Sequence, residues 1–303
     1  MKTLPKLLVI VGPTASGKSD IAVKMAMKYN GEIISADSRQ VYKDLDIGTG
    51  KIMPTEMKGI RHWCLDIADP HGRFTAMDWK EQAEKAIADI ISRGKLPIIC
   101  GGTGFYVSAL IDDLGFPDVK ADTEEQKKLE EKTAEELFDE LKRLDPARAA
   151  TIELKNKRRL ARAIIIAREL GFVPAITRPK EPKYDVTMLG IAMLDSELRE
   201  RIHIRLAKHL NDGMIAEAER LHAPPPTGIS LSYERMEELG LEYKYMAQYL
   251  QMKMPMDELV TVLLAKIWQY ARRQKTWWRK DARVKWLRPE EIEKADTSGL
   301  LSL

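Results

Sequence analysis

The 303-residue chain is poor in several features that would mark other classes of protein. It has only two cysteines, Cys64 and Cys100, and no Cys-x-x-Cys or Cys/His cluster, which disfavours a disulfide framework and a zinc site. No apolar run approaches the ~18 residues that a membrane helix needs. The formal net charge is only +3, so net charge alone does not select a partner.

The composition that remains is typical of a soluble, globular protein. Hydrophobic residues make up 44% and charged residues 31% of the chain, which is enough for a substantial core. The length suggests about two domains. The first six residues lead directly into an apolar segment, so we expect no signal peptide, a cytoplasmic location and no membrane association.

One stretch near the start, residues 12–19, reads G-P-T-A-S-G-K-S. The apolar run 7–11 before it predicts a buried strand, and the apolar spacing of 20–27 predicts a helix. G-x-x-x-x-G-K-[ST] in that context is a phosphate-binding P-loop, in which backbone N–H groups, Lys18 and a Mg²⁺ on Ser19 meet phosphate oxygens. The residues expected to hold phosphate are Gly12, Pro13, Thr14, Ala15, Ser16, Gly17, Lys18 and Ser19.

A second strand is predicted over 31–36, and Asp37-Ser38-Arg39-Gln40 follows it directly. Ligands bind at the carboxyl ends of parallel strands, so Asp37 is placed to face the P-loop. A capping or turn aspartate is an equally good interpretation of the same position.

Further strands are predicted at 61–67 and 96–100, with a helix over 75–93 between them that Thr75 caps and Gly94 ends. The second of these strands runs into Gly101-Gly102-Thr103-Gly104 and a helix over 105–111. This glycine-rich turn is a second place where backbone amides could meet an anion.

The character of the chain changes at residue 112. Residues 118–148 are rich in Glu and Lys and predict exposed helices. Residues 155–168 predict a helix with one apolar face and one basic face almost free of acids, which favours a polyanionic partner. We therefore expect an α/β fold: a P-loop core with a parallel sheet flanked by helices (1–116 and 186–303), and an all-helical insertion domain (117–185) that contacts RNA.

The C-terminal part is predicted to hold a strand over 186–194 and helices over 197–221, 233–251 and 256–278. Residues 266–288 carry nine Lys/Arg against one acid, with tryptophans and a tyrosine interleaved. Arginines neutralise phosphates and aromatic rings stack on unpaired bases, which favours an RNA partner. For the tryptophans alone, a place in the core is an equally good interpretation.

Six blocks, in order over nearly the whole chain, resemble those of the tRNA dimethylallyltransferases, also called tRNA isopentenyltransferases. The blocks are 12–19, 34–42, 46–49, 65–67, 101–106 and 270–277. The resemblance implies a P-loop core with a helical insertion. It also implies an enzyme that transfers the dimethylallyl group of dimethylallyl diphosphate to N6 of adenosine-37, in tRNAs that read codons beginning with U.

The resemblance also implies roles for individual residues. The P-loop, with Mg²⁺ as cofactor, would hold the diphosphate of the prenyl donor rather than the tail of ATP. Lys18, Arg205 and Thr103 would lie on the diphosphate side, and Asp37 would accept a hydrogen bond or proton from the adenine amine. The implied tRNA contacts are Asp37, Ser38, Arg39, Gln40, Thr103, Arg158, Arg159, Leu160, Ala161, Arg162, Arg272 and Arg273. We expect a monomer that binds the anticodon stem-loop.

The chain departs from the family pattern at Asn156, Arg158, Trp268 and Glu242, all on the side where tRNA is expected. Three other functions are weighed against tRNA prenylation. A prenyltransferase of free adenine nucleotides would not need the basic and aromatic segment 266–288. A P-loop kinase of a small molecule needs an acceptor site that the Asp37 block does not suggest. An RNA-binding regulator would not need the full set of site residues.

Overall fold

A computed structural model describes residues 4–119 and 123–294 of the chain. The chain divides into two compact units. The larger unit comprises Met1–Asp112 and Glu181–Leu303, and the smaller unit is Asp113–Lys180. The corresponding boundaries predicted from the sequence are 116/117 and 185/186.

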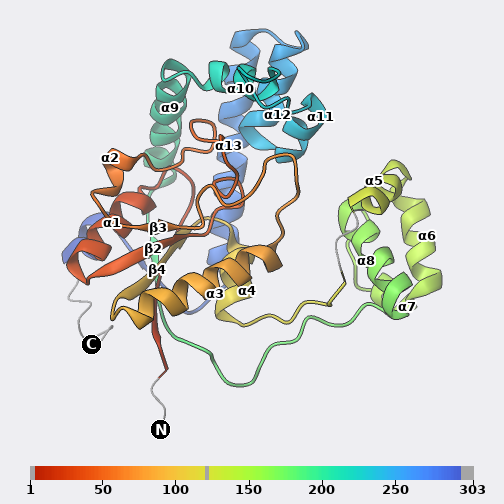
Figure 1. The fold of residues 1–303 in the computed structure, drawn as a ribbon, viewed down its shortest axis with the longest axis horizontal. Coiled ribbons are helices and arrows are strands. Elements are labelled where there is room, and N and C mark those ends of the chain that lie inside the picture. Colours follow the sequence, from red (N-terminus) through yellow and green to blue (C-terminus); the bar gives the residue numbers. More distant parts are fainter. Residues whose placement is uncertain (1–3, 120–122, 295–303) are drawn as a thin grey trace. The chain divides into compact units, whose positions relative to one another are not determined.

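The larger unit is built on a six-stranded sheet in which every pair of neighbouring strands is parallel (Figure 1). The strands are β1 (Lys6–Val11), β2 (Gly31–Ser35), β3 (His62–Trp63), β4 (Leu96–Gly101), β5 (Asp185–Ile191) and β6 (Val284–Leu287), in the order β3-β2-β4-β1-β5-β6. The predicted α/β class with a parallel sheet is confirmed. In the central strands Val9 lies opposite Ile99 on one side and Met188 on the other.

Helices cover both faces of this sheet. The helices of the larger unit are α1 (Lys18–Lys28), α2 (Pro54–Met57), α3 (Ala76–Ser92), α4 (Gly104–Ile111), α9 (Asp195–Asn211), α10 (Met214–His222), α11 (Tyr233–Leu239), α12 (Leu241–Leu250), α13 (Met256–Trp278) and α14 (Pro289–Lys294). Along β1, Leu8 and Ile10 join the apolar cluster under α1, while Leu7 and Val9 join the cluster under α3, α4 and α13. Burial on both faces explains why the strands read as continuous apolar runs.

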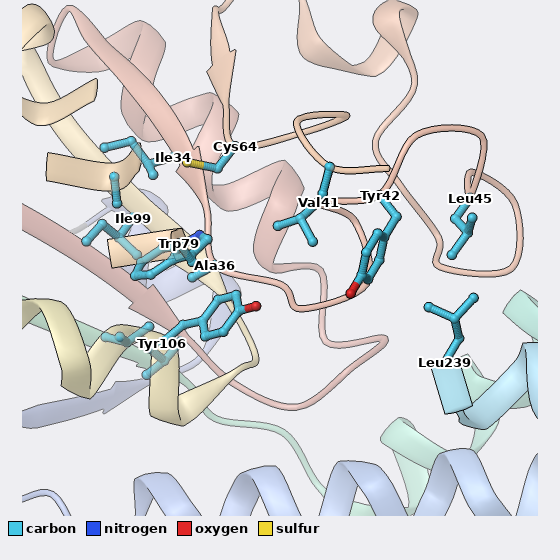
Figure 2. Packing of buried hydrophobic residues seen from close by; sticks show 14 of the residues in the cluster. Ile34, Ala36, Val41, Tyr42, Leu45, Cys64, Trp79, Ile99, Tyr106 and Leu239 are labelled. Carbon is cyan, nitrogen blue, oxygen red and sulfur yellow. The ribbon is translucent and has the colours of Figure 1, made fainter. Parts of the chain in front are cut away.

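A packed aromatic pair supports the carboxyl end of β2. The rings of Trp79 and Tyr106 stack with centroids 4.9 Å apart, as Figure 2 shows among the surrounding apolar side chains. The indole N–H of Trp79 donates to the carbonyl of Ser35, at 2.8 Å. The last residue of β2 is therefore held from the side of α3, two positions before Asp37.

The smaller unit contains four helices in its described part: α5 (Thr123–Glu131), α6 (Ala134–Leu144), α7 (Pro146–Ala149) and α8 (Lys157–Leu170). It has a core of its own, in which Leu137, Leu141, Leu160 and Ile164 are fully buried. None of the helices in the described parts of either unit is long and apolar enough to cross a membrane.

Three predictions of secondary structure are wrong in their extent, and one strand was not predicted. The strand predicted over 61–67 is only His62–Trp63, since Cys64 has a φ of +62°. The helix predicted over 197–221 is two helices separated at Gly213, and the one over 233–251 is two helices separated at Gly240, both glycines with positive φ. Strand β6, inside the basic stretch 266–288, was not predicted.

Candidate active site

The P-loop joins β1 to α1 as the motif predicts. Gly17 precedes the helix with a φ of +84°, and Ala15 also has a positive φ, +62°. The hydroxyl Oγ of Ser16 is buried and has no hydrogen-bond partner among the described residues. A buried, unpaired hydroxyl is costly, so this loop is built to receive an acceptor such as a phosphate oxygen.

Lys18 is half-buried in this loop. Its ammonium Nζ donates to the carbonyl of Pro13, at 2.7 Å. Desolvation is the main cause that lowers the pKa of Lys18 to about 8; the charge of Arg205 acts in the same direction, while Cys100 and Asp37 act in the opposite direction. The ammonium is thus protonated at neutral pH, poorly hydrated and close to a carboxylate.

Two distant helices hold Thr14 of the P-loop. Arg205 of α9 donates from Nη2 to the hydroxyl of Thr14, at 2.7 Å. The backbone N–H of Thr14 donates to Oε1 of Gln274 on α13, also at 2.7 Å. Burial lowers the pKa of Arg205, and the carboxylates of Glu242 and Asp37 oppose that shift. The guanidinium therefore lies beside the loop and within electrostatic reach of both acids.

Asp37 forms a turn at the end of β2. Its Oδ1 accepts from the backbone N–H of Arg39, at 2.8 Å, and from that of Gln40, at 3.4 Å. Next to it, the hydroxyl of Thr103 accepts from the N–H of Ser38, at 3.0 Å. Both interpretations of Asp37 thus apply, because a turn aspartate also lies where its charge acts on the P-loop lysine.

The glycine turn after β4 packs closely against α13. A Cβ on Gly102 would lie 2.0 Å from Nε2 of Gln274, and one on Gly104 would lie 2.3 Å from the ring of Trp277. Helix α13 therefore covers this turn directly. The expectation that the amides of this turn meet an anion stays a prediction.

Glu217 is a site residue that the sequence did not indicate. Its buried carboxylate accepts from the backbone N–H groups of Asp46, Ile47 and Gly48, at 2.7–3.0 Å, and from the hydroxyl of Tyr243 at 2.7 Å. These bonds shape the loop 46–50. The carbonyls of Thr49 and Gly50 in that loop in turn accept from the side-chain amide of Gln40.

The structure shows what surrounds two of the residues that depart from the family pattern, Glu242 and Trp268. Glu242 interacts electrostatically with Arg205 and Asp37, and burial raises the pKa of its carboxyl. Glu242 therefore lies within electrostatic reach of Arg205, which is expected on the diphosphate side, and of Asp37, which is expected to meet the adenine. Trp268 lies under the guanidinium of Arg199, 4.0 Å from it, which makes it part of a cation–π contact between α13 and α9.

The basic residues of the two units have different surroundings. In the smaller unit Arg158 and Arg159 are exposed, and Arg159 pairs with Glu153 at 3.2 Å. Arg168 pairs with two glutamates of α5 and α6, so acids of neighbouring helices meet the basic face at this position. Arg162 is partly buried and donates to the carbonyl of Val119.

Two apolar residues among the predicted tRNA contacts lie in the core of the smaller unit. The side chains of Leu160 and Ala161 are 0% exposed in the core of the smaller unit, so their role there is structural. In the larger unit Arg272 and Arg273 are exposed on α13, whereas Trp278 of the same helix is fully buried. The core interpretation is thus confirmed for Trp278, and stacking of exposed aromatic residues on bases stays a prediction.

The donor set of the P-loop is one that suits Mg²⁺. Among residues 4–119 and 123–294, no three His, Cys, Asp or Glu side chains gather into a candidate metal site. Mg²⁺ keeps several waters and is commonly held by one or two protein ligands together with substrate phosphates. The hydroxyl of Ser19, exposed in the first turn of α1, fits that arrangement.

The sheet, the loop and the residues around it define a P-loop protein in which the phosphate-binding motif lies within electrostatic reach of a carboxylate. A family model described as IPP transferase matches residues 40–281. The chain belongs to this family of prenyl-transferring enzymes, as its sequence motifs indicate.

Relatives of known name extend over nearly the whole chain. The tRNA dimethylallyltransferase of Acetivibrio thermocellus is 38% identical over 300 residues, 96% of this chain and 94% of the relative. The enzyme of the same name from Leuconostoc mesenteroides is 40% identical over 278 residues, 90% of each chain.

Two solved structures have the same fold. The tRNA isopentenylpyrophosphate transferase of Bacillus halodurans is 35% identical, with a TM-score of 0.69 over 95% of this chain and 93% of that one. A eukaryotic dimethylallyltransferase, described as acting on tRNA, is 25% identical, with a TM-score of 0.77 over 97% of this chain and 76% of that one.

Proposed function

We propose that this enzyme transfers the dimethylallyl group of dimethylallyl diphosphate to N6 of adenosine-37 in tRNAs that read codons beginning with U. One observation carries the proposal: Lys18, Arg205 and Asp37 lie within electrostatic reach of one another around the P-loop. Two cations beside the loop suit a departing diphosphate, and a carboxylate next to them suits an amine that must lose a proton. The names of the relatives support tRNA as the acceptor.

The cations act on the leaving group. As the allylic C–O bond breaks, the diphosphate leaves with its electron pair and gains negative charge. Lys18, Arg205 and the P-loop amides stabilise that charge, and the unpaired hydroxyl of Ser16 can donate to a phosphate oxygen. Burial strengthens these interactions, because little water screens them.

The carboxylate of Asp37 acts on the nucleophile, which is the N6 amine of the adenine. N6 forms the new C–N bond and loses one proton, which Asp37 accepts. Because an adenine amine is a weak nucleophile, its position matters more than the basicity of the acceptor. The turn at Asp37 and the bond between Ser38 and Thr103 fix that position at the end of β2.

The proposal also includes Mg²⁺ as cofactor and a tRNA anticodon stem-loop as the partner. Ser19 would hold Mg²⁺ together with diphosphate oxygens and water, and the ion supplies further neutralisation of the leaving charge. The target base leaves the anticodon stack to reach Asp37. We propose a monomeric, cytoplasmic enzyme that holds the anticodon stem-loop through Ser38, Arg39, Gln40 and Thr103 and through exposed arginines of α8 and α13.

A mass-shift assay tests this function. Purified protein, Mg²⁺, dimethylallyl diphosphate and an anticodon stem-loop with A-A-A at positions 36–38 should yield RNA that is heavier by one prenyl group. Asp37→Asn should lower turnover by about 10²–10⁴-fold and keep RNA binding, because only the proton acceptor is removed. A stem-loop with G at position 37 serves as the control.

Other outcomes would overturn the proposal. Hydrolysis of ATP or phosphate transfer without a mass shift would identify a kinase. Prenylation of free adenine nucleotides in preference to RNA would identify the nucleotide-specific alternative. Unchanged turnover of Asp37→Asn would remove Asp37 from its role.

A further inference from the structure

Gln274 is a buried polar residue that the proposed chemistry does not use. It lies on α13, 5% exposed, between the P-loop and the glycine turn. Its Oε1 accepts from the N–H of Thr14, at 2.7 Å, and its Nε2 donates to the carbonyl of Gly102, at 3.1 Å. One side chain therefore connects the loops that follow β1 and β4.

The orientation of this amide is determined by its partners. One partner is a donor and the other an acceptor. A flipped amide would therefore point its NH₂ group at the N–H of Thr14 and its oxygen at the carbonyl of Gly102. The slot also has no spare room, since a Cβ on Gly102 would lie 2.0 Å from Nε2. Gln274 thus has a single arrangement that satisfies both loops.

The bond to Thr14 continues to the P-loop lysine through one peptide group. The N–H of the Pro13–Thr14 peptide donates to Gln274, and the carbonyl of the same peptide accepts from Nζ of Lys18, at 2.7 Å. The peptide is planar, so fixing its N–H also fixes the direction of its carbonyl. Hydrogen bonds in such a chain polarise one another and strengthen together.

We propose that Gln274 is a positioning residue for Lys18. It holds the Pro13–Thr14 peptide so that its carbonyl keeps the lysine ammonium beside the P-loop, ready to meet a diphosphate. The proposal rests on the proposed function only in taking the diphosphate of the prenyl donor as the anion. It concerns a face of α13 different from that of Arg272 and Arg273, which are exposed.

Without Gln274 the N–H of Thr14 would be left unsatisfied in a partly buried place. The peptide would then be held only at its carbonyl, which accepts from Nζ of Lys18 and, at 3.3 Å, from the N–H of Ser16. Rotation of the peptide toward another acceptor for its N–H would turn this carbonyl away from Lys18. The anion site would then have to be organised at the moment of binding. The cost should fall on diphosphate affinity, not on contacts made by the exposed side of α13.

The test measures the binding of inorganic diphosphate by calorimetry. Gln274→Ala should weaken it by about tenfold or more, since one buried donor loses its partner. The KM for the prenyl donor should rise in parallel, while the affinity for the RNA stem-loop stays the same. Gln269→Ala, the same change at an exposed position of the same helix, should leave diphosphate affinity unchanged.

Gln274→Glu adds a second measurement, the pH dependence of diphosphate affinity. A purely structural role of Gln274 would not produce this dependence. An ionised carboxylate can accept from Thr14 but repels the carbonyl of Gly102, whereas a protonated carboxyl can donate to it. The ratio of variant to wild-type diphosphate affinity should therefore rise toward one as the pH falls. Measuring the wild type at each pH removes the titration of diphosphate itself.

Clear results would overturn the inference. One is wild-type diphosphate affinity in Gln274→Ala with an unchanged unfolding temperature. Another is an affinity ratio for Gln274→Glu that does not depend on pH. Absence of prenyl transfer by the wild type, with diphosphate binding intact and sensitive to Gln274, would reject the proposed function and leave this inference standing.

Discussion

At the residue scale, burial gives the charged groups of the site properties that they would lack in water. The ammonium of Lys18 has lost part of its hydration. It donates a hydrogen bond to the carbonyl of Pro13 and interacts electrostatically with Asp37. His209 lies near Arg205 and Gly50, and burial together with the arginine lowers its pKa to about 4, so it is neutral at physiological pH. The imidazole therefore adds no positive charge to the site beside Lys18 and Arg205.

The pH dependence of donor use should report the titration of Lys18. With its pKa lowered to about 8, the ammonium is charged below that pH and loses its proton above it. We expect kcat/KM for dimethylallyl diphosphate to fall as the pH rises through about 8, because kcat/KM reflects the free enzyme. The fall in kcat should occur at higher pH, because bound diphosphate stabilises the charged form.

Lys18→Arg serves as the control for this profile. A guanidinium stays charged throughout the range, so the variant should be less active but show no fall near pH 8. A profile with the same fall in Lys18→Arg would assign the titration to another group.

At the element scale, α8 and α13 each combine a buried stripe with a basic surface. In α8 Leu160 and Ile164 fill the core of the smaller unit, while Arg158 and Arg159 face outward. In α13 the buried side holds Gln274 against the P-loop and glycine turn. The helix period of 3.6 residues separates the two roles along one segment.

The outward arginines of α8 should govern the salt dependence of RNA binding. Replacing Arg158 and Arg159 with Gln together should weaken binding to the stem-loop and reduce the salt slope by about 2, roughly 1 for each phosphate contact. Filter binding over a range of salt concentrations measures this slope.

Arg168→Gln is the matched control on the same helix. Its guanidinium is paired with two carboxylates, those of Glu125 and Glu140, whereas Arg159 is paired with Glu153 at 3.2 Å. The change should leave the slope unchanged and lower the stability of the smaller unit by at most about 1 kcal/mol, as for other exposed ion pairs. An equal loss of slope in both variants would show that general charge, not these positions, drives binding.

At the scale of the whole molecule, the chain forms two units with separate cores. The sheet of the larger unit is buried by α1 and α14 on one face and by α3, α4 and α13 on the other. The smaller unit has its own apolar cluster of α5, α6 and α8. The residues expected to bind diphosphate all belong to the larger unit.

Ile164→Ala should therefore separate the two functions. Loss of this fully buried side chain should destabilise the smaller unit by about 2–4 kcal/mol. Hydrogen exchange should speed up within residues 123–170, and RNA affinity should fall while diphosphate affinity stays unchanged. Ile87→Ala on α3 should speed up exchange in the larger unit instead. Loss of diphosphate affinity in Ile164→Ala would contradict the independence of the units.

The sequence by itself determined the features that are encoded locally. The strand, P-loop and first helix lie within residues 6–28, so apolar spacing, glycines and the lysine identify them together. Asp37 could be placed because it follows a predicted strand of a parallel sheet. The motifs in order along the chain identified the family, which the relatives confirm.

Only the tertiary structure decided which distant residues complete the site. Gln274 meets Thr14 across 260 positions, and Glu217 meets the loop at Ile47 across 170. Periodicity and turn chemistry act over about 20 residues, so they cannot say which face of α13 meets the P-loop or that Glu242 lies near Arg205. Those neighbours are set by the packing of helices against the sheet, where the bare glycines at 102 and 104 let α13 approach.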